Sequence, residues 1–257
     1  MENMDTAIII ARLVNQIIVS QKNLFDIDAV SQVVRKLRLI AVHSLARMYR
    51  PEERLFAFRL RRNGRGETLE GVSRRYTAMA LIGLAGEEPN IAAEVLRGHS
   101  RDDVCGQLLD EVTNSQELGE VALTAWAARM LRHSRTHKIL ETLRQMDPAR
   151  IAYPTIELSW ALTALAISPG EPADVALAER VANALMASFR WESGVFPHGP
   201  ARKGIAALGA HVSNFADFVY PIQALSYYHK TSGDAKAAEI ACRCAERMCR
   251  LQGPQGQ

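Results

Sequence analysis

The sequence repeats part of itself at a distance of 140 residues. Residues 184–226 align with residues 44–86 without a gap, and nine of the 43 aligned positions are identical. Each copy runs from one predicted helix to the next through a long connection, 50–72 in the first copy and 190–213 in the second. A spacing of 140 residues accommodates three helical hairpins of roughly 45–50 residues each. The repeat therefore predicts an array of hairpins, either an open solenoid or a ring closed into a toroid.

Helical periodicity dominates the rest of the chain. Breakers such as Pro51, Gly86 and Pro148 lie between the periodic segments. The predicted helices lie near residues 6–20, 28–49, 73–85, 88–98, 101–112, 117–133, 135–146, 154–167, 173–189, 214–230 and 234–251. Strand signals are limited to 55–58 and 195–196. We expect residues 1–257 to form a single all-α domain.

Composition narrows the class of protein. The net charge of +3 gives no reason to expect a nucleic-acid partner. The apolar stretch 7–19 is interrupted by Arg12 and is too short to span a bilayer, and no targeting segment precedes it. The four cysteines lack metal-ligand spacing and are expected to be small buried residues in a reducing compartment. We expect a cytoplasmic protein without a metal ion, a cofactor or a transmembrane segment.

A shorter pattern follows each predicted outer helix of the repeat. Its three copies read Arg50-x3-Arg54-x-Phe56, Arg190-x3-Gly194-x-Phe196 and Gln252-x3-Gly256. The third copy would place its aromatic residue at position 258, and the sequence stops at Gln257. This ending suggests a C-terminal truncation in which one or two closing hairpins are missing.

The pattern resembles the Gln-x3-Gly-x-Trp motif of the squalene cyclase and prenyltransferase superfamily. In that family the Gln caps the end of an outer helix and the Trp stacks on it. Arginine is a reasonable replacement because it also donates to helix-end carbonyls and stacks on aromatic rings. Segments 70–77 and 214–221 also look like bacterial toroid proteins of uncertain role, some of which occur beside polysaccharide genes. The resemblance implies an α/α toroid, as a partial or open ring.

The sequence departs from that family where its catalytic motifs would lie. The acidic Asp-x-Asp-Asp motif is absent, and Asp102-Asp103 is not followed by the third aspartate of Asp-Asp-x-x-Asp. The zinc ligands of the protein prenyltransferase subunits cannot be assigned either. The resemblance therefore carries over an architecture but no catalytic residue.

In a toroid, the long connections deliver the N-termini of the inner helices to one mouth of the ring. Helix N-termini attract anions because they carry free N–H groups and partial positive charge. Among the basic side chains here, the candidate ligand-binding residues are Arg74, Arg75, Arg202 and His211. Such a mouth suits a diphosphate, a uronic acid or a phosphorylated glycan. The alternative is a solvated basic surface without a ligand.

Three side chains are candidates for acid–base chemistry. Glu70 and Asp217 each lie near the start of a predicted inner helix, and His198 lies in the Phe-Pro-His-Gly-Pro segment of the second long connection. A carboxylate paired with a histidine can act as a general acid–base unit. The alternative for Asp217 is stabilisation of the helix N-terminus.

Aromatic side chains on predicted inner helices are further candidates for ligand binding. Tyr76, Trp160 and Tyr220 could stack on a sugar or stabilise a carbocation, whereas the alternative is packing between helices.

Two hypotheses about the function remain. The first is a terpene-cyclase-like toroid enzyme that acts on an isoprenoid diphosphate or an anionic glycan. The second is a non-catalytic helical-repeat scaffold or inactive toroid fragment. An open ring would expose an apolar seam, for which we expect a second copy or closing hairpins as cover. In the enzyme, Glu70, Arg74, His198, Asp217 and Tyr220 would line one cavity.

Overall fold

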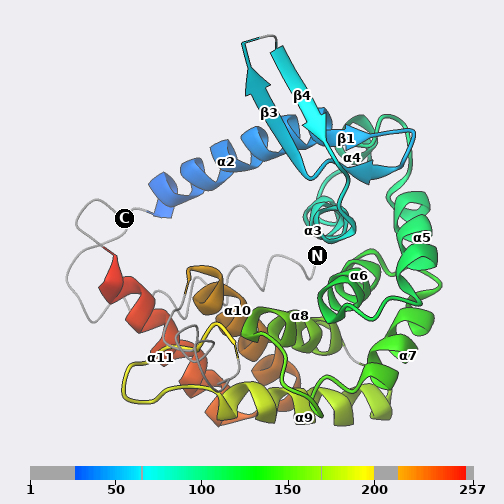
Figure 1. Ribbon diagram of the computed structural model, residues 1–257. Coiled ribbons are helices and arrows are strands. Elements are labelled where there is room, and N and C mark those ends of the chain that lie inside the picture. The colour runs from blue at the N-terminus through cyan, green and yellow to red at the C-terminus, as the bar shows by residue number, and fades with distance from the viewer. Residues whose placement is uncertain (1–26, 65, 169, 200–213, 253–257) are drawn as a thin grey trace.

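The computed structural model describes residues 27–64, 66–168, 170–199 and 214–252. Within these ranges the chain forms an inner and an outer layer of helices that follow an arc (Figure 1). The inner helices are α3 (Arg74–Leu84), α6 (Leu118–Leu131), α8 (Thr155–Ala166) and α10 (Ala216–Ser232). The outer helices are α2 (Ile27–Met48), α4 (Pro89–Val95), α5 (Arg101–Val112), α7 (Thr136–Met146), α9 (Pro172–Ala187) and α11 (Ala235–Leu251).

The sequence of each helix explains its layer. Helices α6 and α8 are rich in Ala, Leu and Thr on every side, and nearly all their residues are buried. A helix that is apolar all round is stable only when it is enclosed. Helix α11 instead buries one stripe, Ala237, Ile240, Ala241 and Cys244, at the spacing of a single helix face. The all-α prediction is confirmed, and the observed bounds lie within a few residues of those predicted.

The 140-residue repeat is also a repeat in space. In the first copy, β1 (Tyr49–Arg50) pairs with β2 (Leu55–Phe56), and Arg190 bridges Val195 at the same place in the second copy. An aromatic pair follows each outer helix, with ring centroids 5.2 Å apart for Tyr49–Phe56 and 5.0 Å for Phe189–Phe196. The predicted Phe positions of the motif are therefore buried anchors for the turn.

Each of these turns needs a residue in the left-handed region. Arg54 has φ of 50° and Gly194, which lies 140 positions later, has φ of 71°. Glycine adopts this conformation without steric cost, and an arginine there is uncommon. The third copy, at Gln252-x3-Gly256, lies mostly outside the described residues, as does the predicted helix 6–20.

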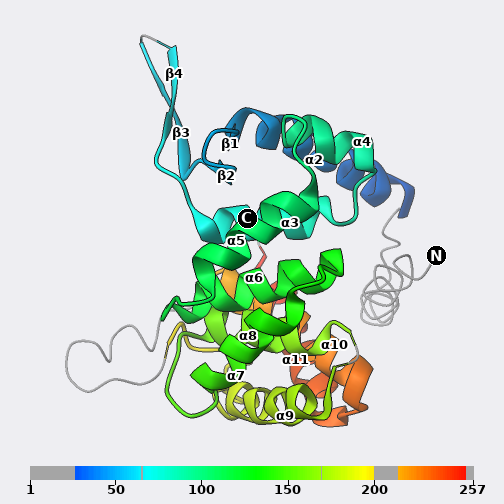
Figure 2. The same cartoon turned by 90° about the vertical axis from the view of Figure 1, so that its right-hand side faces the viewer.

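The first long connection contains a hairpin that the sequence did not predict. β3 (Arg59–Asn63) pairs antiparallel with β4 (Gly66–Glu70) and extends away from the helices (Figure 2). Its strands are mostly polar, so they lack the alternation that marks a strand with one buried face. Gly64 was the available signal, because the pair Asn63–Gly66 leaves a two-residue turn that begins at Gly64, and glycine is favoured at that position in one common hairpin turn.

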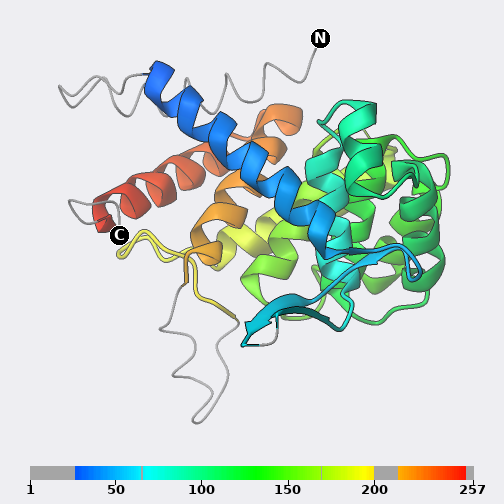
Figure 3. The same ribbon diagram turned by 90° about the horizontal axis from the view of Figure 1, so that it is seen from above.

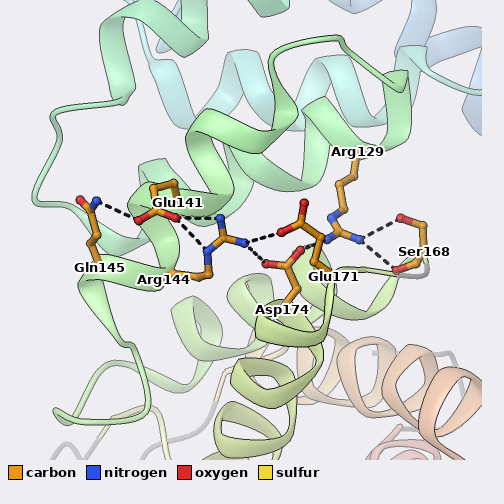
Figure 4. A network of polar contacts seen from close by, with 7 residues as sticks. All are labelled: Arg129, Glu141, Arg144, Gln145, Ser168, Glu171 and Asp174. Atoms are coloured by element: carbon orange, nitrogen blue, oxygen red, sulfur yellow. Dashed lines mark hydrogen bonds and ion pairs between the residues drawn. The ribbon is translucent and has the colours of Figure 1, made fainter.

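A buried ionic network joins two neighbouring hairpins, α6–α7 and α8–α9 (Figure 4). The Asp174 carboxylate of α9 accepts from Arg129 of α6 and from Arg144 of α7, each at 2.7 Å. Arg129 also donates to the Ser168 carbonyl at 2.9 Å. Only 2% of the Asp174 side chain is exposed. Because a carboxylate this deeply buried depends on its partners, the network fixes how α6, α7 and α9 are arranged.

The ends of the described arc are α2 and α11, which lie on the same flank of the molecule (Figure 3). Helix α2 packs on α4. Along it Val30, Val33, Leu37 and Ile40 are exposed. No helix in the described ranges is long and apolar enough to cross a membrane. The expected apolar seam is thus present on α2 in this part of the chain, and its cover stays a prediction.

The four cysteines differ in reactivity because they differ in burial. Burial raises the pKa of the Cys105 and Cys244 thiols to about 12, and it also raises the pKa of Cys242. Cys249 is exposed. We expect alkylation at neutral pH to modify Cys249 first, Cys242 slowly, and the other two only after unfolding. Peptide mass spectrometry checks this order, and rapid labelling of Cys105 in the folded protein would contradict the core placement.

Candidate active site at the inner-helix N-termini

Polar contacts tie together the N-terminal ends of the inner helices. Arg75, at the start of α3, lies 3.3 Å from Glu117, which precedes α6, and 3.1 Å from Glu157 in the first turn of α8. The amide of Thr155, the first residue of α8, donates to the His198 carbonyl at 3.2 Å. His198 in turn contacts Asp217 in the first turn of α10. The N-termini of the four inner helices therefore lie on the same face of the arc.

His198 and Asp217 form the central pair of this site. The His198 Nδ1 atom lies 3.3 and 3.2 Å from the two carboxylate oxygens of Asp217. The Asp217 side chain is fully buried, whereas 51% of the His198 side chain is exposed. The Asn214 Nδ2 atom also lies 3.3 Å from Nδ1, so this ring nitrogen meets an acceptor from Asp217 and a donor from Asn214. If the Asp217 contact is a hydrogen bond, the ring proton lies on Nδ1, because a carboxylate only accepts. The lone pair of Nε2 is then available to a ligand.

The local backbone holds Asp217 in place. The Asn214 amide donates to Asp217 Oδ2 at 2.8 Å, and the Asn214 Oδ1 atom accepts from the amides of Ala216 and Asp217 at 2.9 and 3.2 Å. Asn214 thus satisfies free N–H groups in the first turn of α10. The Asn-x-x-Asp spacing at 214–217 was a sequence signal for this arrangement.

Arg75 crosses over α6 at a glycine. A Cβ atom on Gly119 would lie 2.7 Å from Arg75 Cζ and 3.0 Å from Glu157 Oε1. The missing side chain leaves room for the guanidinium to reach from α3 to α8. Sequence reasoning did not select Glu117, Gly119 or Glu157 for this site, because nothing in their local pattern shows which distant arginine they meet.

This arrangement makes Gly119→Ala informative. The guanidinium is the far end of a flexible side chain, so we expect it to swing away and lose its ion pairs at a cost of about 1 kcal/mol. The matched control is Gly83→Ala in α3, where a Cβ would meet nothing within 4 Å. That change should stabilise the protein by about 0.4–1 kcal/mol. Urea denaturation compares the two variants, and equal stabilisation by both would show that Arg75 is not held above Gly119.

Beneath the carboxylates lies an aromatic pair. Trp160 is one turn after Glu157, Tyr220 is one turn after Asp217, and their rings meet edge to face with centroids 5.4 Å apart. The Trp160 ring is buried, and its Nε1 atom has no hydrogen-bond partner among the described residues. The pair joins α8 to α10, so helix packing accounts for most of its contact.

The other predicted site residues have partners of their own. Arg74 lies 3.0 Å from Glu111 and 3.6 Å from Glu120, and the hydrogen bond to Glu111 raises the pKa of Arg74. Tyr76 stacks on Phe58, with ring centroids 5.6 Å apart.

Glu70 and two of the basic candidates stand apart from this group. Glu70 lies on β4, where a hydrogen bond from Arg59 lowers the pKa of Glu70. Arg202 and His211 lie outside the described residues. The structure therefore brings His198, Asp217, Trp160 and Tyr220 together with Arg75, while Glu70 and Arg74 make separate contacts.

In the described part of the chain, no group of three or more His, Cys, Asp or Glu side chains is arranged to hold a metal ion. The site chemistry argued below uses only side chains of the chain itself.

Comparison with known proteins bears on the fold. No protein-family model matches the chain, and no curated protein matches its sequence. Among solved structures, the chain is similar to an unsaturated glucuronyl hydrolase specific for heparin. The TM-score is 0.57 and the identity 14%, over 86% of this chain and 68% of the other. The fold is an α/α toroid. At this identity the likeness extends to the fold alone, and the features specific to squalene cyclases find no support in it.

Proposed function

We propose that this α/α toroid acts on an anionic glycan and binds a uronic-acid unit at the N-terminal ends of its inner helices. One observation carries the proposal. A half-exposed imidazole, His198, is held at 3.2 Å by the fully buried carboxylate of Asp217. A base oriented by a second group is the usual arrangement of a general acid–base catalyst.

The proposed roles follow from the contacts. Asp217 orients the His198 ring, and Nε2 exchanges a proton with an attacking water or a leaving oxygen. Arg75 supplies a planar guanidinium that suits a substrate carboxylate. Glu117 and Glu157 hold that guanidinium at the mouth.

Charge balance favours a uronic acid over an isoprenoid diphosphate. Arg74 and Arg75 each meet two carboxylates, so these described residues of the mouth carry no excess positive charge. A diphosphate carries several charges and is usually held by a metal ion or by unpaired cations, whereas one carboxylate needs a single guanidinium. The name of the similar solved protein, a glucuronyl hydrolase, supports the same class of ligand.

One observation favours the alternative of a non-catalytic scaffold. Asp217 lies 140 positions after Thr77, and the Thr77 hydroxyl accepts from the Phe56 amide at 2.9 Å. In the first copy this position ties the long connection to its inner helix. A purely structural Asp217 would do the same for His198.

Ligand binding separates the two functions. We would measure thermal stability with heparin-derived uronic-acid disaccharides, the same disaccharides with the carboxylate esterified, and farnesyl diphosphate. We expect saturable stabilisation of about 2–3 kcal/mol at roughly 100 times the dissociation constant, only with the free carboxylate. Arg75→Gln should weaken this effect. Equal shifts with the ester, or none with any ligand, would favour the scaffold.

A further inference from the structure

A pocket lies on the outer layer, beside helix α11. It has a volume of about 530 Å³ and is formed between the turn at residues 191–194 and one face of α11. The turn follows α9 and runs beside α11 (Figure 1). Pockets of a few hundred cubic ångströms are the size that binds small ligands.

The repeat shows what is unusual about this pocket. In the first copy, Gln107 of α5 donates to the Glu53 carbonyl at 2.8 Å and so joins the turn to the outer helix. The same 140-residue offset places Arg247 at the position of Gln107 and Trp191 at the position of Pro51. A tryptophan that is 38% exposed thus replaces a proline, and an arginine replaces the glutamine.

The lining carries three arginines and three glutamates, and among the described residues most of them lack an ion-pair partner. The Arg243 guanidinium lies 5.3 Å from the centroid of the Trp191 ring. Arg247, Glu192 and Glu239 also line the pocket. Within the described ranges, the ion pair found in this lining is Arg250–Glu246, at 3.6 Å. The pocket is therefore lined both by guanidinium groups, which only donate hydrogen bonds, and by carboxylates, which only accept them.

We propose that this pocket is a second saccharide-binding site, for a neutral or sparsely charged sugar. Hydroxyl groups both donate and accept, so a sugar can bond to the glutamates and the arginines together. The part of the Trp191 ring that Arg243 and Phe189 leave exposed offers an apolar surface for the less polar face of the sugar. A highly sulfated chain fits less well, because the glutamates would repel it. The choice of a sugar rests in part on the proposed glycan function, whereas the pocket and its lining do not.

Direct titration tests this site, and binding at the mouth is disabled by using Arg75→Gln as the parent protein. Calorimetry would measure the binding of maltotetraose, a hyaluronan tetrasaccharide and a heparin tetrasaccharide. We expect maltotetraose or the hyaluronan tetrasaccharide to bind more tightly than the heparin tetrasaccharide. Trp191→Ala and Arg247→Ala should each weaken that binding at least tenfold.

The matched control is Arg180→Ala, which removes an exposed arginine of α9 outside this pocket and should leave affinity unchanged. An unchanged urea midpoint for Trp191→Ala confirms that the variant is folded. Binding that survives Trp191→Ala, tighter binding of the heparin chain, or no binding of any probe would overturn the second site. If the protein binds an oligosaccharide through Trp191 but shows no glycan turnover, the proposed function is wrong and the inference of a saccharide site on the outer layer stands.

Discussion

Replacing Asp174 with alanine is expected to destabilise the protein by about 3–5 kcal/mol, because it removes the carboxylate that balances the buried charge of Arg129. The Asp174 carboxylate contacts Arg129 and Arg144, and only 5% of the Arg129 side chain is exposed. Burial already lowers the pKa of Arg129, so the loss of Asp174 removes the charge that offsets this cost. Urea denaturation measures the change in free energy of unfolding.

The matched control is Asp110→Ala, which breaks a surface pair. Asp110 lies 2.5 Å from Arg135, and its side chain is 69% exposed. Exposed pairs contribute about 0–1 kcal/mol, so this variant should stay close to the parent protein. Similar losses in the two variants would mean that the Asp174 network does not hold helices α6, α7 and α9 together.

Replacing His198 with glutamine is expected to lower glycan turnover by about 100- to 10,000-fold, the usual contribution of a positioned general acid–base group. Asp217→Asn should lower turnover as well, because an amide side chain can turn an NH2 donor toward Nδ1 and then no longer holds the ring as the carboxylate does. Its carbonyl oxygen still accepts from the Asn214 amide, so the fold should persist. Single-turnover rates and urea midpoints are measured for the parent and both variants.

Thr77→Ala separates a structural role from a chemical one. Thr77 holds the equivalent position in the first copy and ties the Phe56 amide, but it makes no contact with His198 among the described residues. We expect this variant to lose stability while its turnover per folded molecule is unchanged. If His198→Gln kept the parent rate within about twofold, the pair would be structural and the acid–base assignment would fail.

The helical architecture was predictable because local signals determine it. Pro51 and Gly233 lie just after the ends of helices in the structure, as their residue types predict. The apolar surfaces of α6 and α8 indicate burial on all sides. The spacing of the repeat predicted three hairpins between its copies, and three pairs of inner and outer helices lie there. The hairpin at 59–70 was missed because arginine and glutamate ion pairs, rather than an apolar face, join its strands.

The candidate site was only partly predictable. His198 and Asp217 were selected as a potential pair from residue type and position, and they do lie in contact, while their catalytic role stays a prediction. The sequence did not show that carboxylates balance the positive charge of Arg74 and Arg75, because these carboxylates come from distant parts of the sequence. Tertiary ion pairs of this kind leave no local pattern in a single sequence.

The most direct test of the glycan-acting site is product release from a heparin-derived disaccharide that ends in an uronic acid. The protein would be incubated with this disaccharide, and free monosaccharides would be quantified by mass spectrometry. We predict release by the parent protein and at least a hundredfold slower release by His198→Gln. No release together with no binding, or equal release by the two proteins, would contradict the account.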